Sequence, residues 1–323
     1  PRSMLEDQLC RIFQQVLGME KIGIRDNFFH IGGDSIIAIE LVSVIRREGL
    51  RVSTKDIFDA PTIAQLAVRI CRSDVEREVS TEQGELVGEF GLLPIQQQFF
   101  DKSLARPHHW NQAFIVDIPT AIEGTVLAKV INRLIVQHDV LRCRFNQGTD
   151  GTYRQVFLPV SEVAMTPFKI DTSSLSDDEL EDKLTGIQSK LNYSTGPLWQ
   201  VAHLTGYSDG VSRLWFAFHH LTIDAVSWRI LVDDIRYLLS GGLLGDKTSS
   251  YRQWVAGIAD YATRHEDEVK YWQSVLDDQV PRSVSDKSCQ YRLFLSEDIT
   301  GALLRDANSG YKTEINDLLL SAL

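Results

Sequence analysis

Residues 219–228 read HHLTIDAVSW and mark the point where the chain changes from one kind of secondary structure to another. Before them, residues 212–218 (SRLWFAF) form a short apolar and aromatic run with the length of a buried strand. After them, apolar residues recur at helical spacing, namely Val226, Ile230, Leu231, Ile235, Leu238 and Leu239. We therefore expect a strand, a loop and a helix, and loops on a rigid α/β scaffold are where functional residues concentrate.

The loop contains His219, His220 and Asp224, and three interpretations of these residues are open. The histidines can be hydrogen-bonded structural residues at a strand end. They can bind a metal ion with Asp224, but adjacent strand residues point to opposite faces, so the two histidines are poorly placed to chelate one ion and we expect no metal site. Alternatively, one histidine is a general base and Asp224 fixes the loop.

Outward from this loop, strands and helices alternate from about residue 89 onward, which is typical of an α/β domain. We expect strands at residues 153–158, 197–204, 212–218 and 291–295, and helices at residues 251–261, 266–276, 296–308 and 314–323. Residues 72–84 are charged and contain no aromatic residue, so they are expected to form a solvated linker.

The composition narrows the class of protein. A length of 323 residues favours two domains, and 43% hydrophobic residues support packed cores. The net charge of −11 without a basic patch argues against a nucleic-acid partner. The chain has no apolar run long enough to span a membrane and no signal peptide, and its cysteines are widely spaced, so we expect a cytoplasmic protein with reduced thiols. The cysteines are Cys10, Cys71, Cys143 and Cys289.

Residues 1–72 show three helical stripes, which predict a small helical bundle. The first stripe runs from Leu5 to Val16 and ends near Gly18, the second follows Ser35, and the third follows Pro61. The segment Gly32-Gly33-Asp34-Ser35 precedes the second stripe and is compatible with ordinary helix capping. On this evidence alone capping is favoured, and the alternative is an exposed serine that an enzyme modifies with a phosphodiester, since a helix N-terminus favours negative charge.

The pattern HHxxxDxxSW of residues 219–228 resembles the core motif of the condensation and epimerization domains of nonribosomal peptide synthetases. Residues 227–231 (SWRIL), including Ser227 and Trp228, resemble the epimerization branch. The resemblance implies that His220 is the catalytic base next to His219, and that Asp224 is structural and held by an arginine. Ala225 stands where the family usually has glycine, which matters only if the backbone needs a positive φ there.

Other segments are similar to motifs of the same family. Residues 94–100 (PIQQQFF) resemble the PIQxWF start of epimerization domains, with Phe99 in place of tryptophan, and residues 109–112 (HWNQ), with Asn111, resemble their HFNQ strand. Residues 138–145 (HDVLRCRF) are similar to the HExLRxxF motif of the superfamily. Within this motif Arg142 and Arg144 are our candidates for the arginine that holds Asp224.

The first segment resembles a peptidyl carrier protein, because residues 26–35 (DNFFHIGGDS) match the carrier's DNFFxxGGxS loop. The resemblance implies a four-helix carrier bundle in which 4′-phosphopantetheine is attached to Ser35 beside Asp34, by a phosphopantetheinyl transferase. The GGDS variant followed by Ile36 resembles carriers that directly precede epimerization domains. No metal or other cofactor is implied.

Together the resemblances imply a carrier domain at residues 1–72, a linker at 73–88, and an epimerization domain from 89 to 323 with the α/β chloramphenicol-acetyltransferase-like fold. We expect the chain to cover the first half of that domain and the beginning of the second. An EGHGRE-like motif of the second half supplies a glutamate in the family, and residues 1–323 contain no match to it.

The expected function is epimerization of an L-aminoacyl or peptidyl thioester at its α-carbon, with an adenylation domain upstream and a condensation domain downstream. Two alternatives remain at this point. One is a condensation domain, which forms a peptide bond, and the other is a noncatalytic platform on which a carrier docks. The Ser227–Trp228 pair and the HWNQ segment favour epimerization over condensation.

Overall fold

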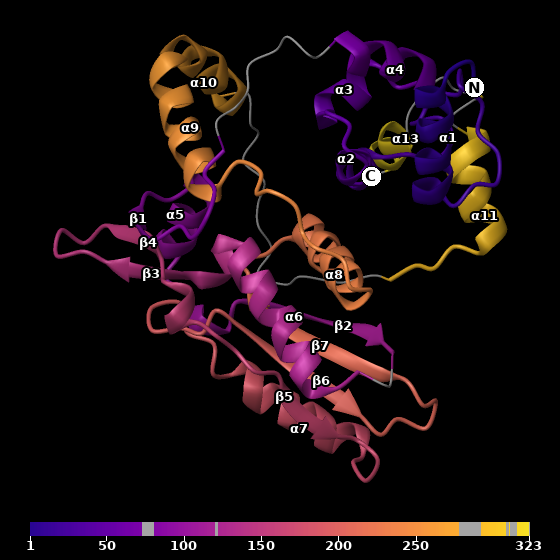
Figure 1. Cartoon of the computed structure of the whole chain (residues 1–323). Helices are drawn as coiled ribbons and strands as arrows, with labels where there is room; N and C mark the ends of the chain where they lie inside the picture. The colour runs from indigo at the N-terminus through magenta and orange to yellow at the C-terminus, as the bar shows by residue number, and fades with distance from the viewer. Residues whose placement is uncertain (73–80, 120–121, 278–291, 308–309, 311–314, 323) are drawn as a thin grey trace. The chain divides into compact units, whose positions relative to one another are not determined.

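The computed structural model describes residues 1–72, 81–119, 122–277, 292–307, 310 and 315–322 (Figure 1). The chain forms two compact units: one contains residues 1–72 and the described residues after 291, and the other contains residues 81–277. The described residues after 291, which we expected in the second domain, group with the first unit.

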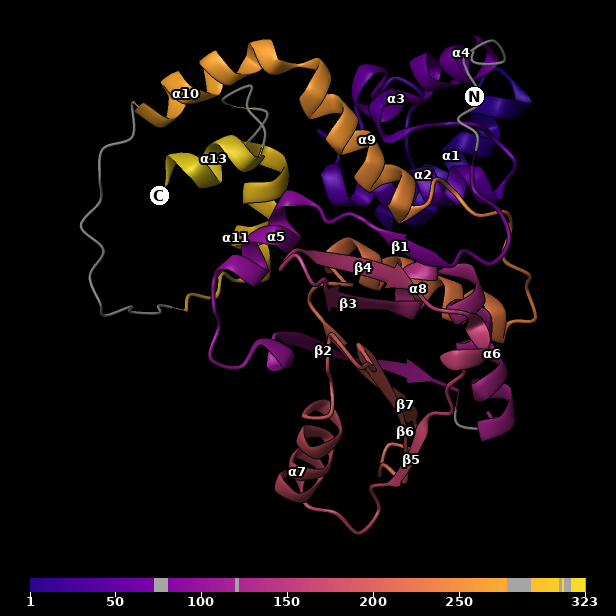
Figure 2. The same cartoon turned by 90° about the vertical axis from the view of Figure 1, so that its left-hand side faces the viewer.

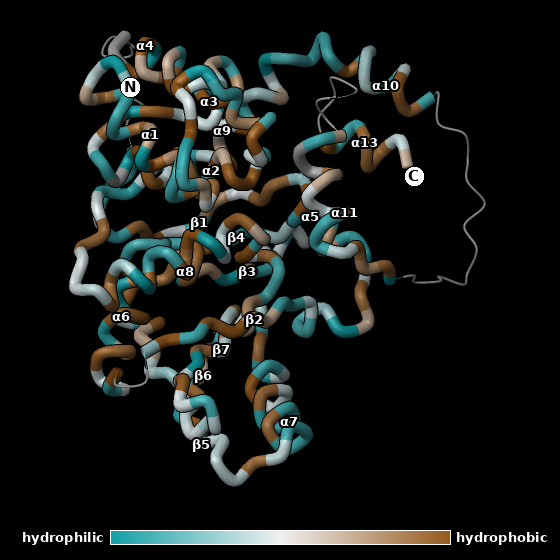
Figure 3. The backbone as a smooth tube through the Cα atoms, turned by 90° about the vertical axis from the view of Figure 1, so that its right-hand side faces the viewer, coloured by the Kyte–Doolittle hydropathy of each residue, from teal (hydrophilic) through white to brown (hydrophobic). Residues whose placement is uncertain are grey.

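The first unit contains the expected helical bundle, made of α1 (Met4–Leu17), α2 (Ser35–Arg47), α3 (Thr54–Asp59) and α4 (Ile63–Arg72). Figure 3 shows hydrophobic and hydrophilic residues alternating along α1, as an amphipathic helix requires. The apolar faces meet in one core, whose fully buried residues include Leu9, Phe13, Phe28, Leu41, Ile45, Ile57 and Leu66. The predicted helical carrier-type bundle is confirmed, and α3 has only six residues, too few to give a clear helical period.

The second unit is built on a sheet with the strand order β2-β7-β6-β5. β2 (Asn111–Ile118), β7 (Ser212–His219) and β6 (Trp199–Thr205) are antiparallel neighbours, and β5 (Phe168–Asp171) is parallel to β6. In Figure 1, α6 (Gly124–Gln137) and α8 (Ala225–Leu239) lie on one face of this sheet and α7 (Asp177–Gln188) lies on the other. Both faces of the central strands are therefore covered, which explains the nearly continuous apolar sequence of β7.

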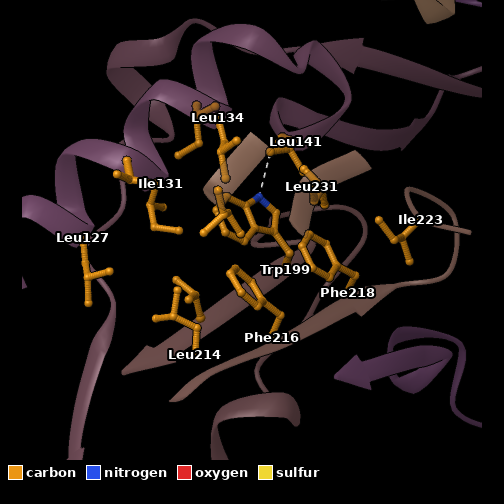
Figure 4. Packing of buried hydrophobic residues seen from close by; sticks show 14 of the residues in the cluster. Leu127, Ile131, Leu134, Leu141, Trp199, Leu214, Phe216, Phe218, Ile223 and Leu231 are labelled. Atoms are coloured by element: carbon orange, nitrogen blue, oxygen red, sulfur yellow. Dashed lines mark hydrogen bonds between the residues drawn. The ribbon is translucent and has the colours of Figure 1, made fainter. Parts of the chain in front are cut away.

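Alternation of side chains along β7 divides the residues between two cores. Phe216 and Phe218 point toward α6 and α8, while Trp215 and Ala217 point toward α7. Figure 4 shows the larger core, in which the Trp199 ring packs against Phe218 and its Nε1 donates a hydrogen bond to the Leu141 carbonyl at 2.9 Å. This core fixes the end of β7, where the histidine loop begins.

A second, three-stranded sheet of order β1-β4-β3 belongs to the same unit (Figure 2). Its antiparallel strands are β1 (Gly88–Phe90), β4 (Tyr153–Phe157) and β3 (Cys143–Gln147). Short helices connect the two sheets, namely α5 (Pro94–Asp101), η2 (Pro107–His109), η3 (Asp139–Arg142) and η4 (Val160–Glu162). After α8 come α9 (Tyr251–Arg264), η5 (Glu266–Glu268) and α10 (Val269–Asp277), where two helices were expected.

Part of the expected linker is ordered structure. Residues 73–80 lie outside the described residues, but residues 82–86 are hydrogen-bonded to the second unit; we call them the strap. The Glu82 carboxylate accepts from Arg252 at 2.6 Å, and the Leu86 carbonyl accepts from Arg142 at 2.9 Å. The expectation of a solvated segment at residues 72–84 is therefore wrong for residues 82–84, because their polar groups find partners far along the chain.

The described residues after 291 contain α11 (Glu297–Gly301), the π-helix η6 (Ala302–Asp306) and α13 (Ile315–Ser321). The strand expected at residues 291–295 is not formed by residues 292–295, and Tyr291 lies outside the described residues. Leu293 and Phe294 are 85% and 84% exposed, so this apolar run has no strand beside it within the described part of the chain. No helix among the described residues is long and apolar enough to cross a membrane. Cys10 and Cys143 are free and buried.

Candidate active site

The HHLTIDAVSW segment forms the connection between β7 and α8, as the sequence predicts. His219 is the last residue of β7, and Asp224 is the N-cap of α8. The intervening turn closes on the His219 carbonyl, which accepts hydrogen bonds from the backbone N–H of Thr222 at 3.0 Å and from its hydroxyl at 2.9 Å. The loop is thus tied to the end of a central strand, which gives its side chains fixed positions.

The His219 side chain is fully buried beneath the loop. Its Nε2 lies 2.8 Å from the Pro107 carbonyl, which can only accept, so Nε2 carries the proton. Its Nδ1 accepts from the backbone N–H of Leu221 at 3.2 Å. Burial lowers the pKa of His219 to about 4, despite the opposing effect of the Pro107 hydrogen bond. His219 is therefore a neutral structural residue, held edge-on against Phe99.

His220 has the opposite surroundings, because its side chain is exposed. Its backbone N–H donates to the Trp110 carbonyl at 2.8 Å, which continues the pairing of β2 with β7 by one residue. Its Nδ1 lies 3.0 Å from the Ile223 carbonyl, so the neutral ring carries its proton on Nδ1 and Nε2 is a proton acceptor. The Gln112 amide nitrogen lies 3.2 Å from this Nε2.

His220 lines a cavity of about 690 Å³ in the second unit, and His219 does not. Most of the cavity wall is apolar or aromatic; these residues are Leu93, Ile95, Phe99, Leu104, Trp110, Val140, Leu221, Ile223, Tyr251 and Trp254. Polar groups come from Gln96, Gln98, Lys102, Thr222, Asp224 and Ser227. A mostly apolar pocket with a few convergent polar groups is the usual form of a small-molecule site.

Asp224 acts as a helix cap. Its Oδ1 accepts from the backbone N–H and the hydroxyl of Ser227, both at 2.7 Å, which satisfies the first turn of α8. Ala225 is the first residue of that helix, so its φ is negative and alanine introduces no strain in place of glycine. Trp228 follows and packs against Phe114 with ring centroids 4.0 Å apart.

The expected pairing of Asp224 with an arginine is wrong. Arg142 is enclosed, and its guanidinium donates to Asp139 at 2.6 Å and to three backbone carbonyls, which use its hydrogen-bonding groups elsewhere. Arg144 lies beside Gly196, so closely that a Cβ on that glycine would be 2.9 Å from the Arg144 Nε. The motif of residues 138–145 therefore stabilises the second sheet and the strap.

Asn111 was expected beside the site, but it lies on the opposite face of β2 from His220. Its amide donates to the His109 carbonyl at 2.7 Å, and its oxygen accepts from Gln188 of α7. The next residue, Gln112, reaches His220 instead. Gln112 was part of the HWNQ resemblance, and strand alternation from His220 through its partner Trp110 could have identified it.

In the first unit, Ser35 is the exposed first residue of α2. The Asp34 carboxylate accepts from the backbone N–H groups of Ile36 and Ile37 at 2.8 and 2.7 Å, so it caps the helix. Gly32 has a φ of 107°, which favours glycine, and a Cβ on Gly33 would lie 2.4 Å from the Phe28 ring. The two glycines thus hold a tight loop that leaves the serine hydroxyl accessible.

Two sequence profiles match the chain. The Phosphopantetheine attachment site matches residues 7–70, and the Condensation domain matches residues 87–323. Among the described residues, no three histidine, cysteine, aspartate or glutamate side chains come together as a metal site.

The chain is 37% identical to N-(5-amino-5-carboxypentanoyl)-L-cysteinyl-D-valine synthase of Amycolatopsis lactamdurans, over all of this chain and 9% of the relative. It is 32% identical to gramicidin S synthase 1 of Brevibacillus brevis, over all of this chain and 31% of the relative. The chain thus spans a minor part of these curated relatives.

Solved structures show the same similarity. The epimerization domain from the third module of tyrocidine synthetase B matches with a TM-score of 0.66 and 31% identity, over 75% of this chain and 59% of that chain. The first condensation domain of the calcium-dependent antibiotic synthetase matches with a TM-score of 0.58 and 19% identity, over 72% and 59%. This second match, at 19% identity, supports the fold alone.

Residues 7–70 thus define a carrier domain, and residues 87–323 define a condensation-type α/β domain. The chain belongs to the condensation-domain family of nonribosomal peptide synthetases. Its carrier segment indicates a covalently attached 4′-phosphopantetheine.

Proposed function

We propose that this chain epimerizes an L-aminoacyl or peptidyl thioester at the α-carbon to the D form, with His220 as the acid/base group and Ser35 as the attachment residue. The observation that carries the proposal is the placement of His220. Its ring is exposed on the wall of an apolar cavity, Nδ1 is held by the Ile223 carbonyl, and Nε2 is the proton-accepting nitrogen, with the Gln112 amide 3.2 Å away. The 31% identity to a solved epimerization domain supports the choice of reaction.

The residues around Ser35 fit a covalent phosphopantetheine, because Ser35 is exposed at the start of α2 and nothing lies within 4 Å of a Cβ placed on Gly32. When attached, the group supplies a thiol that carries the acyl chain as a thioester, whose α-proton is more acidic than that of an amide. Asp34 occupies the first N–H groups of α2, so its role is to hold the helix start.

The proton transfer follows from the His220 tautomer. The Gln112 amide first gives up the Nε2 lone pair to the substrate. As the α-carbon–hydrogen bond breaks, its electron pair stays on the thioester as an enolate, Nε2 gains the proton, and the ring becomes an imidazolium whose Nδ1–H still donates to Ile223. A second acid returns a proton to the opposite face, so no net proton is gained or lost. The resemblance assigns this role to a glutamate of an EGHGRE-like motif, to which residues 1–323 contain no match.

We further propose that an adenylation domain supplies the acyl group and that a downstream condensation domain accepts the D product. The test uses a module with the complete domain, loaded on Ser35 with an L-aminoacyl group in deuterated water, with and without an aminoacyl carrier as acceptor. Epimerization predicts α-deuterium and D product without the acceptor. Peptide-bond formation without α-exchange would identify a condensation domain. The absence of both reactions would identify a docking platform.

A further inference from the structure

Gln112 on β2 is the described residue whose side chain is hydrogen-bonded to the Nε2 atom of His220. The pairing of the strands accounts for this contact. Gln112 is opposite Phe218, and the Trp110 carbonyl accepts from the His220 backbone N–H at 2.8 Å. Trp110, Gln112 and His220 therefore lie on the same face of the sheet, and the 3.2 Å distance between the two side-chain nitrogens follows from the register.

The chemistry of the contact depends on the protonation state of the ring. In the neutral ring the Nδ1 proton is fixed on the Ile223 carbonyl, so Nε2 presents a lone pair and the Gln112 NH₂ donates to it. In the imidazolium both ring nitrogens are donors, and an NH₂ group facing Nε2 is then repulsive. Rotation of the amide by half a turn replaces the NH₂ with Oε1, which accepts from the protonated Nε2.

We propose that Gln112 is a positioning residue: its NH₂ holds the neutral His220 ring until the substrate's α-proton approaches Nε2, and after the transfer its turned amide accepts from the protonated ring. The inference rests on the proposed role of His220 as acid and base. A primary amide provides a donor and an acceptor on one short side chain, whereas a carboxylate favours only the charged ring and an apolar residue favours neither. Gln112 itself gains and loses no proton.

Other charged or titratable groups near the ring have separate roles. The Asp224 carboxylate of the α8 cap accepts from Ser227, and His219 beneath the loop bonds Pro107 and Leu221. Burial raises the pKa of Tyr251 on α9 to about 12, so its hydroxyl stays neutral at physiological pH. Lys102, which follows α5, lines the same cavity and carries positive charge. The hydrogen bond to the His220 Nε2 therefore comes from Gln112 of β2 and not from these groups.

The test compares Gln112→Glu and Gln112→Leu with wild type in two independent measurements. Nitrogen-15 NMR of histidine-labelled chain follows the tautomer and the titration of His220 without requiring activity. Gln112→Glu is expected to move the midpoint of the His220 titration upward by about one pH unit, because a carboxylate stabilises the imidazolium. Gln147→Glu, on the β3 hairpin, adds the same charge away from the cavity and should leave the midpoint unchanged.

The second measurement is α-proton exchange in the module with the complete domain. Gln112→Leu should reduce kcat for exchange about tenfold, the size of one hydrogen bond, with little change in KM. In Gln112→Glu the acid limb of the pH–rate profile should move to higher pH by the same amount as the NMR midpoint. An unchanged midpoint in Gln112→Glu, or an unchanged kcat in Gln112→Leu, would overturn the positioning role. Wild-type exchange in a variant that lacks His220 would instead overturn the proposed function. The NMR titration does not depend on activity, so it would still test the contact between Gln112 and His220.

Discussion

His219 and His220 are neighbours in the chain, yet their rings carry the proton on different nitrogens. The Pro107 carbonyl fixes the proton of His219 on Nε2, and the Ile223 carbonyl fixes that of His220 on Nδ1. The buried ring has its remaining nitrogen occupied by a backbone N–H, whereas the exposed ring has its remaining nitrogen 3.2 Å from the Gln112 amide. His219 thus supports the loop, while the His220 ring lines the cavity.

The buried His219 should make stability depend on pH. Its pKa is about 4 in the folded chain and near 6.5 when unfolded, so the unfolded state binds the proton first. The stabilising contribution is complete above pH 6.5 and is lost as the pH falls toward 4, by about 3 kcal/mol in total. Denaturant unfolding between pH 4 and 7 should show this slope in wild type and a shallower one in His219→Gln. Equal slopes would contradict the neutral buried state.

Asp224 should contribute as a helix cap. Asp224→Ala removes the acceptor for Ser227 and should lower the free energy of unfolding by about 1 kcal/mol, measured by denaturant titration. Asp224→Asn keeps an acceptor oxygen and should cost less, and Ser227→Ala is the matched control that keeps the cap to the backbone N–H. A loss of 3–5 kcal/mol would indicate a buried ion pair instead.

The sequence predicted the positions of the motif residues well and their partners poorly. The histidine loop, the N-cap position before Ser35 and the exposure of that serine follow from local patterns. The partners of Arg142 and Asn111 do not, because Leu86 and Gln188 lie far along the chain and only the folded packing brings them near. Strand alternation would have selected Gln112 once the register of β2 with β7 was known.

Among the secondary-structure elements, those with a clear period were predictable and those defined by distant contacts were not. β7, α8, α9 and α10 appear near their expected positions because each has an apolar face of its own. The strap was missed because its charged sequence resembles a solvated linker. In the structure its side-chain and backbone polar groups form hydrogen bonds with α9, η3 and Lys247. At residues 292–295 the error is the opposite one: a strand was expected and is not formed. An apolar run becomes a strand only when another strand lies beside it.

Breaking the strap should loosen the start of the second unit. Glu82 accepts from Arg252 at 2.6 Å and from Ser250, and these bonds lower the pKa of its carboxyl. Glu82→Gln and Arg252→Ala should each cost about 1 kcal/mol and the double variant less than their sum. The contribution is present above the ordinary glutamate pKa and fades as the pH falls through the lowered one. Additive effects in a denaturation cycle would show that the pair does not form.

For the molecule as a whole, Ser35, the proposed attachment residue, and His220, the proposed base, belong to different units, so modification and α-exchange should be separable by mutation. Intact-mass analysis after treatment with a phosphopantetheinyl transferase and coenzyme A should show one added group on wild type and none on Ser35→Ala. Ser43→Ala, on the same helix, is the control and should be modified fully. An equal mass gain on Ser35→Ala would place the attachment elsewhere.

The role of His220 in proton transfer is tested most directly by α-deuterium incorporation in the module with the complete domain, loaded with an L-aminoacyl group in deuterated water. His220→Ala should be loaded normally, while its exchange and D-product formation fall about 10²–10⁴-fold, the usual contribution of a general base. His265→Ala, which removes a histidine at the end of α9, should exchange at the wild-type rate. Exchange in His220→Ala at a rate near that of wild type would contradict the account.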